Sequence, residues 1–182
     1  RPENPEEPGG QSFRATSRQT PHQPHPAPLG AGTSVPTPTT LRTRMVETNL
    51  LGSMYAVHTA LPHLLKSKGT VLQVSSTSGR IASAGGAVYA ATKFGVNAFS
   101  EALRQEVTAQ GVRVVIVEPG FVSTELADHI SDPASRAAAQ QMAASMRTLQ
   151  PEDIANAVVY ALTQPEHVAV NEILIRPTDQ TR

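Results

Sequence analysis

Two side chains with complementary acid–base chemistry lie four residues apart near the middle of the sequence. Tyr89 and Lys93 bound the stretch Tyr-Ala-Ala-Thr-Lys, and a spacing of four places both side chains on one face of a helix. A free phenol has a pKa of about 10, which is too high for an effective base at neutral pH, and a neighbouring ammonium lowers that pKa by favouring the phenolate. The pair is therefore suited to proton transfer.

Two polar residues upstream extend this candidate set. Ser76 lies thirteen residues before Tyr89, directly after a short apolar run, and Asn49 lies in an earlier helical pattern. Ser75 is a competing candidate for the role of Ser76, although the spacing to Tyr89 favours Ser76. Each residue also has a simpler interpretation, since Tyr89 and Lys93 could form an ordinary exposed pair on a helix and Asn49 could face solvent.

Composition and motifs exclude several other classes of function. The 15 basic and 15 acidic side chains balance, so nothing indicates a nucleic-acid partner. No cysteine is present, which excludes disulfides, thiolate zinc sites and cysteine nucleophiles. No metal site is predicted, because His22 and His25 lie in a segment without fixed geometry. A Ser/His/Asp hydrolase needs a Gly-x-Ser-x-Gly turn, whereas Ser76 is flanked by Ser75 and Thr77.

Nothing in the sequence indicates association with a membrane. No apolar run approaches the roughly 20 residues needed to cross a bilayer. The first residues are acidic and rich in proline, unlike a secretory leader. We therefore expect a cytoplasmic protein without membrane contact.

Hydrophobic periodicity predicts the elements that position the candidate residues. Apolar residues recurring at steps of three or four indicate helices, and short β-branched runs indicate strands. Gly111 is well suited to end the helix that carries Tyr89. Helices are expected at residues 46–64, 88–110 and 133–146 and from Pro151 onward, and strands at 70–74, 112–117 and 171–175.

The alternation of these elements predicts an α/β fold with a Rossmann-like, doubly wound parallel sheet. Continuous apolar strands separated by helices are typical of a parallel sheet covered on both faces. Ligands of such sheets bind at the carboxyl ends of the strands. We therefore expect the loops at residues 75–86 and 118–125 to build the functional site.

Residues 1–42 differ in composition from the rest of the chain. They hold nine of the 15 prolines, and their sparse apolar residues follow neither a helical nor a strand period. Such a segment cannot bury enough surface to offset the entropy of ordering it, so it is predicted to be disordered. The chain is accordingly divided into a Pro-rich segment at 1–42 and a catalytic α/β portion at 43–182.

Four sequence pieces, in this order and at these spacings, resemble the short-chain dehydrogenase/reductase family. They are Asn49 in ETNLLG, Ser76 in VSSTSG, the YAATK motif, and EPGFVSTEL from residue 118. The resemblance extends over residues 43–182 and implies an oxidoreductase that moves a hydride between a nicotinamide cofactor and a carbonyl carbon. It further implies that Tyr89 is the general acid/base, that Ser76 hydrogen-bonds the substrate oxygen, and that Asn49 holds a water through its helix backbone.

The same resemblance implies a cofactor, a substrate class and an oligomeric state. Lys93 matches a residue that also binds the nicotinamide ribose. The carboxyl end resembles NADP-preferring serine and 3-hydroxy acid dehydrogenases, which implies NADP(H) rather than NAD(H) and a small alcohol or hydroxy acid, or the matching carbonyl, as substrate. Helices matching residues 45–65 and 88–110 form the main dimer contact of the family, which implies a homodimer or homotetramer. The residues matching the segment that contacts the nicotinamide carboxamide and a nearby phosphate are Pro119, Gly120, Val122 and Thr124.

The sequence departs from the family in the region that should bind the rest of the dinucleotide. A TGxxxGxG turn and an NNAG strand end are both missing, and residues 1–42 stand in their place. We hypothesise that residues 1–42 are an out-of-frame or spliced-in segment, expect weak or absent cofactor affinity, and expect an unpaired sheet edge at the strand 70–74. The alternative function is that of a catalytically inactive, truncated remnant that associates through its helices with a full-length relative.

Overall fold

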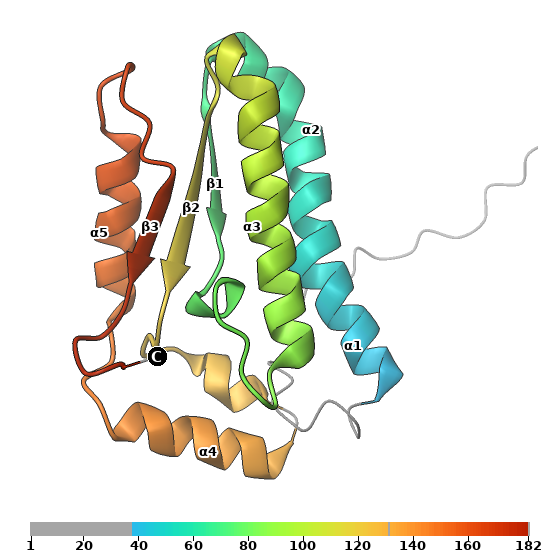
Figure 1. The fold of residues 1–182 in the computed structure, drawn as a ribbon, viewed down its shortest axis with the longest axis vertical. Helices are drawn as coiled ribbons and strands as arrows, with labels where there is room; N and C mark the ends of the chain where they lie inside the picture. Colours follow the sequence, from blue (N-terminus) through green and yellow to red (C-terminus); the bar gives the residue numbers. More distant parts are fainter. Residues whose placement is uncertain (1–37, 131, 182) are drawn as a thin grey trace, which may run out of the picture.

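Helices flank a parallel sheet on both sides in the computed structural model, which describes residues 38–130 and 132–181 (Figure 1). The predicted α/β class with a Rossmann-like, doubly wound parallel sheet is confirmed. The disorder predicted for residues 1–37 lies outside the described residues. No helix in the described ranges is long and apolar enough to cross a membrane.

The sheet contains three strands in the order β1-β2-β3: Thr70–Val74, Arg113–Pro119 and Glu172–Ile175. Both pairings are parallel. Thr70 lies opposite Arg113, and Ile116 lies opposite Glu172. All three strands consequently end at the same edge of the sheet, where the loop after β1 also lies (Figure 1).

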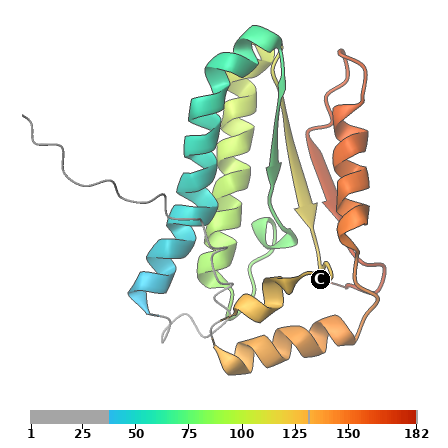
Figure 2. The same ribbon diagram turned by 180° about the vertical axis from the view of Figure 1, so that it is seen from behind.

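Two helical layers cover the two faces of the sheet. The helices are α1 (Thr39–Val46), α2 (Gly52–Ser67), α3 (Ala87–Val107), α4 (Pro133–Ala144) and α5 (Pro151–Leu162). Both ribbon views place α2 and α3 side by side against one face and α5 against the other, while α4 lies across the carboxyl edge (Figures 1 and 2).

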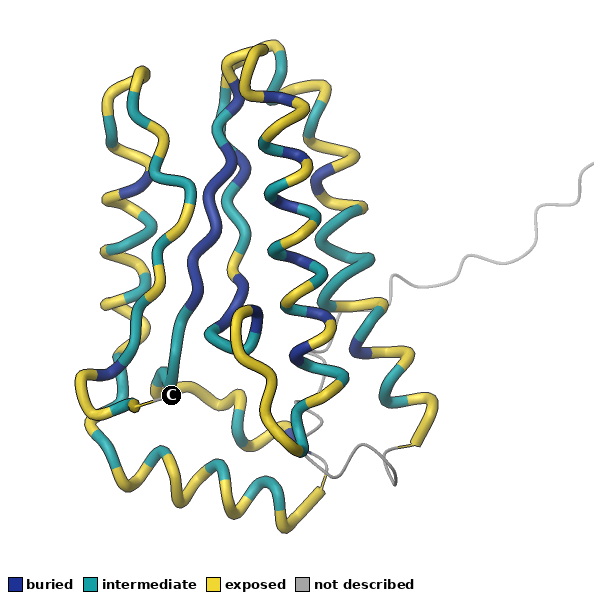
Figure 3. Tube along the Cα trace, in the orientation of Figure 1, coloured by how far each residue is buried: buried dark blue, intermediate teal, exposed yellow. Residues whose placement is uncertain are grey.

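The residues of β2 alternate between two apolar clusters. Val112 and Val114 pack with side chains of α2 and α3 on one face, whereas Val115 and Val117 pack with Ala161 of α5 on the other. Side chains of a strand point alternately to its two faces, so a continuous β-branched run is buried on both sides. Figure 3 shows this central strand as the most continuously buried segment of the chain.

The predicted helix 46–64 is longer than expected and is not a regular α-helix. It begins at Thr39, so residues 39–42, which composition assigned to the disordered segment, are helical. The Pro38 carbonyl accepts hydrogen bonds from the backbone N–H groups of Leu41 and Arg42 at 3.0 and 3.2 Å, which starts the helix immediately after the proline. A π-helical turn at Glu47–Leu51 then separates α1 from α2.

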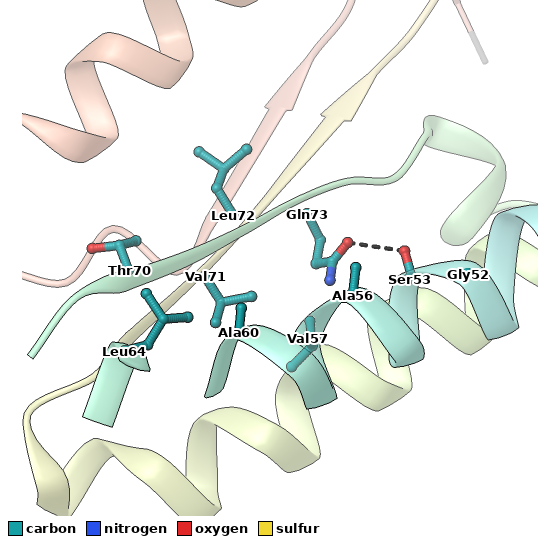
Figure 4. Close-up of a pocket in the computed structure, with 10 residues that line it drawn as sticks. All are labelled: Gly52, Ser53, Ala56, Val57, Ala60, Leu64, Thr70, Val71, Leu72 and Gln73. Carbon is teal, nitrogen blue, oxygen red and sulfur yellow. Dashed lines mark hydrogen bonds between the residues drawn. The ribbon is translucent and has the colours of Figure 1, made fainter. Parts of the chain in front are cut away.

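One edge of the sheet is formed by β1. An apolar groove of about 500 Å³ runs between β1 and α2, and a hydrogen bond of 3.0 Å from Ser53 to Gln73 crosses it (Figure 4). Val74, the last residue of β1, is 51% exposed. Among the described residues, no strand pairs with the outer side of β1.

A left-handed glycine ends the helical segment that leads into β2. After α3 comes a 3-10 turn at Thr108–Gln110, and Gly111 follows with a φ of 82°. The sequence indicated Gly111 as a helix stop, and the structure confirms it. L-residues disfavour this backbone region because their Cβ approaches a carbonyl oxygen.

We expect Gly111→Ala to lower the free energy of unfolding by about 1 kcal/mol, because alanine must adopt a left-handed conformation there. Urea unfolding monitored by circular dichroism measures this change. Gly52→Ala is the matched control, because Gly52 has ordinary helical angles and an added Cβ would come no nearer than 3.4 Å to another atom. A loss at Gly52 as large as that at Gly111 would contradict the backbone explanation.

Candidate active site

The two loops that were predicted to build the functional site begin at the same edge of the sheet. Val74 of β1 pairs with Val117 of β2, so residues 75–86 and 118–125 start side by side. A 3-10 turn, η2 (Thr77–Gly79), follows β1 immediately, and α3 then carries the chain back along the sheet. The turn η2 and the first residues of α3 therefore lie next to the carboxyl end of β2.

Ser76 is positioned by its role at the start of η2. Its backbone is extended, and its Oγ accepts a hydrogen bond from the backbone N–H of Ser78 at 3.1 Å. The side chain is buried, and it lies close enough to the Tyr89 phenol to lower the pKa of that group. Ser75 instead donates from its Oγ to the Lys93 carbonyl at 3.4 Å. Ser76, rather than Ser75, is therefore the serine that the fold brings to Tyr89.

Tyr89 and Lys93 lie in the first turns of α3 and face the same edge. The Lys93 ammonium is 5.7 Å from the centroid of the Tyr89 ring, and it donates a hydrogen bond to the Val74 carbonyl oxygen at 3.0 Å. Three of the four candidate residues, Ser76, Tyr89 and Lys93, thus lie at the same edge of the sheet.

Burial determines the charge state of this group. It raises the pKa of the Tyr89 phenol above its ordinary value, and the hydrogen bond from Ser76 opposes that rise. Burial also lowers the pKa of the Lys93 ammonium to about 8. The sequence interpretation expected Lys93 to lower the pKa of Tyr89. That expectation is wrong for this structure, because removal of the phenolate from water is the larger effect.

Asn49 contacts the site through α3 rather than through Lys93. It lies in the π-helical turn, and its Nδ2 donates to Thr92 Oγ1 at 3.3 Å. Thr92 Oγ1 in turn donates to the Tyr89 carbonyl oxygen at 2.7 Å. Gly95 allows this close approach, because a Cβ there would lie 3.0 Å from the Leu50 side chain. The water expected on the Asn49 backbone stays a prediction.

The segment Pro119–Thr124 lies at the same edge but is held by other partners. The Gly120 N–H donates to the Ile175 carbonyl at 2.7 Å, and Val122 forms a parallel bridge with Leu149. Thr124 caps the short 3-10 helix Glu125–His129 through its hydroxyl. Hydrogen bonds of this segment therefore run to β3 and to the stretch before α5.

Among these residues, Lys93 has the donors that the nicotinamide end of a dinucleotide would need. The hydrogen bond to Val74 uses one of the three N–H donors of Lys93, which leaves donors for vicinal ribose hydroxyls. The Gln180 side chain lies against Gly120, where its Oε1 accepts a hydrogen bond from the Phe121 N–H at 3.0 Å. The pyrophosphate end lacks a counterpart within residues 38–181, where no TGxxxGxG turn occurs.

Sequence patterns did not indicate a group of charged and amide side chains next to the site. Glu118 is fully buried at the end of β2, and it pairs with Arg80 and Asn97. The sequence signal that could have indicated this group was the carboxylate of Glu118 at the end of a β-branched run. A charge that is buried in this way requires a partner. The identity of those partners depends on the fold, since they lie 38 and 21 residues away.

Comparison with known proteins identifies the family. The short chain dehydrogenase family model matches residues 32–135, and the chain belongs to this family. The match begins before residue 42, where composition placed a boundary. An uncharacterized oxidoreductase of Staphylococcus saprophyticus is 38% identical over 141 residues, which are 76% of this chain and 56% of that protein. The chain thus spans little more than half the length of this relative.

Solved structures give the same result. The closed form of a serine dehydrogenase complexed with NADP+ superposes with a TM-score of 0.79 and 31% identity, over 85% of this chain and 63% of that one. An alcohol dehydrogenase from the archaeon Thermococcus sibiricus, complexed with 5-hydroxy-NADP, superposes with a TM-score of 0.71 and 25% identity, over 86% of this chain and 62% of that one.

Removal of the Ser76 hydroxyl should raise the pKa of Tyr89, because the hydrogen bond between them opposes the effect of burial. The measurement is a pH titration of tyrosinate absorbance for the parent chain and for Ser76→Ala, each compared with its Tyr89→Phe counterpart to isolate Tyr89. Ser78→Ala is the control, because it keeps the backbone N–H that binds Ser76. An unchanged midpoint in Ser76→Ala would contradict the contact.

Lys93→Met should change how stability depends on pH. The pKa of Lys93 is about 8 in the folded chain, whereas an ordinary lysine in the unfolded chain has a pKa of 10.5. Between these pH values the folded chain therefore binds fewer protons than the unfolded chain. The free energy of unfolding of the parent chain therefore rises with pH across this window, and Lys93→Met should lack that rise. Urea unfolding at several pH values measures it. Lys66 is exposed, so Lys66→Met should keep the same dependence of the free energy of unfolding on pH as the parent chain. If Lys93→Met also kept that dependence, the burial assigned to Lys93 would be wrong.

Proposed function

We propose that this site reduces the carbonyl group of a small substrate to an alcohol with a nicotinamide cofactor, or catalyses the reverse oxidation. The observation that carries the proposal is the convergence of Ser76, Tyr89 and Lys93 at the carboxyl end of β1, where the Lys93 ammonium lies 5.7 Å from the centroid of the Tyr89 ring and donates to the Val74 carbonyl. Membership of the short chain dehydrogenase family supports the reaction class.

The charge states suit the reducing direction. Because burial raises the pKa of Tyr89, the phenol is protonated at neutral pH and can donate its proton to a carbonyl oxygen. The Ser76 hydroxyl, held beside the phenol, can hydrogen-bond the same oxygen. A reduced nicotinamide, when bound, would supply the hydride to the carbonyl carbon. Lys93, with a pKa of about 8, can then return a proton towards Tyr89.

The proposed cofactor is NADP(H), and the proposed substrate is a small hydroxy acid or alcohol or its carbonyl form. Both structural relatives described above carry an NADP-type ligand, and one is a serine dehydrogenase. Lys93 would hold the ribose hydroxyls. Pro119, Gly120, Val122 and Thr124 would hold the carboxamide side of the nicotinamide.

A second function concerns association rather than catalysis. The described residues lack a TGxxxGxG turn, and the chain covers 56% of the Staphylococcus relative. The alternative proposal is that the chain acts by pairing through its helices with a full-length relative. The proposed contact, which would also form a homodimer or homotetramer, is the helical surface at residues 45–65 and 88–110, where Tyr55 is 65% exposed and Phe94 is 43% exposed.

If the catalytic proposal is correct, Tyr89→Phe should lower kcat for carbonyl reduction by roughly 10²- to 10⁴-fold, the usual contribution of a positioned acid. The assay follows NADPH consumption with small aldehydes and keto acids. Tyr160→Phe is the matched control, because Tyr160 is 57% exposed on α5. Full activity in Tyr89→Phe would contradict the proposed acid.

The same assay separates the two functions. Turnover of NADPH by the isolated chain would exclude the association role as its only function. Absence of turnover, together with co-purification with a full-length relative and no NADPH binding in a fluorescence titration, would favour association.

A further inference from the structure

A buried carboxylate next to the site has both of its oxygens occupied. Glu118 is fully buried as the penultimate residue of β2. Its Oε2 accepts from Arg80 Nε at 2.6 Å, and its Oε1 accepts from Asn97 Nδ2, also at 2.6 Å. These three residues form what we call the Glu118 clamp. None of them takes part in the proton transfer described above.

The clamp ties four elements together. Asn97, on α3, donates from the same Nδ2 to the Gly79 carbonyl at 3.3 Å, and Arg80 follows η2 and also pairs with Glu172 of β3. The packing leaves little room for movement, because a Cβ on Gly79 would lie 2.8 Å from both Asn97 Nδ2 and Ser75 Oγ. The turn η2 is therefore fixed against α3, β2 and β3.

The turn that the clamp holds is the one that presents Ser76. A 3-10 turn of three residues has little stability of its own, so its orientation depends on the contacts at its two ends. At the front, the Ser75 N–H donates to the Val117 carbonyl at 2.8 Å. After the turn, the hydrogen bond of the Gly79 carbonyl with Asn97 and that of Arg80 with Glu118 provide the corresponding anchor.

We propose that the Glu118 clamp is a positioning device that holds the turn η2, and with it the Ser76 hydroxyl, beside the first turns of α3, which carry Tyr89. The inference rests on the proposed function, and it assigns Arg80, Asn97 and Glu118 as positioning residues for that reaction. Arg80 is the adjustable member, because its side chain is 38% exposed whereas that of Glu118 is inaccessible. Loss of Arg80 leaves the Glu118 carboxylate buried without its cation, which forces the turn to move or to admit water.

The test is a double-mutant cycle read by the tyrosinate titration of Tyr89 in the full chain. Arg80→Ala should shift the titration midpoint to higher pH, in the same direction as Ser76→Ala. In the Ser76→Ala background, Arg80→Ala should cause no further shift, because the hydroxyl through which it acts is gone. Additive shifts, or an unchanged midpoint in Arg80→Ala, would overturn the proposal.

Two controls separate positioning from a general loss of stability. Gly111→Ala destabilises the chain at the opposite end of β2, and Arg104→Ala removes the solvent-exposed pair with Glu101 on α3. Both should leave the Tyr89 midpoint at its parental value, and a shift in either would overturn the assignment. If Arg80→Ala does not fold, Glu172→Gln replaces it, because it removes only the outer carboxylate. Its expected shift is smaller and in the same direction, and no shift would count against the clamp.

The titration of Tyr89 does not depend on turnover, so the clamp and the proposed reaction can be disproved independently of each other. Coupling between Arg80 and Ser76 in a chain that reduces no carbonyl substrate would uphold the clamp and reject the proposed reaction. Turnover that depends on Tyr89, without any coupling, would uphold the reaction and reject the clamp.

Discussion

The parallel pairing of β1 with β2 is the interaction on which the site depends. It brings Val74 level with Val117, so the turn that carries Ser76 and the strand end that carries Glu118 start from the same height. Because β2 is buried on both faces, its position is set by two apolar clusters at once. Helix α3 then needs only to return along the sheet to place Tyr89 beside Ser76.

Burial of the site opposes charge on both of its titratable groups. It raises the pKa of the Tyr89 phenol and lowers that of the Lys93 ammonium, so the neutral form of each is favoured. At neutral pH the lysine is charged and therefore unfavourable for folding, although it is suited to passing a proton. Residues that reduce stability in exchange for reactivity are typical of functional sites.

Local sequence determined most of the elements and part of the site. Period and spacing predicted the sheet and the helix that carries Tyr89 and Lys93, whereas the roles of Ser76 and Ser75 stay predictions. The π-helical turn at Asn49 was not predictable from period, because hydrophobic periodicity does not distinguish it from the α-helices on either side. Long-range pairs escaped prediction as well: no local signal links Arg80 to Glu118 before the strands are placed.

The pairing of Arg80 with Glu172 has a consequence for the order in which the chain matures. Glu172 belongs to β3, the last of the three strands in chain order, and Gln180 beyond it accepts a hydrogen bond from the Phe121 N–H at 3.0 Å. A nascent polypeptide that still lacks these residues already contains Ser76 and Tyr89, but Arg80 is without its partner Glu172 and the Phe121 N–H is without its acceptor Gln180. The full set of contacts around this edge of the sheet can therefore form only after the last strand has been synthesised and has docked against β2.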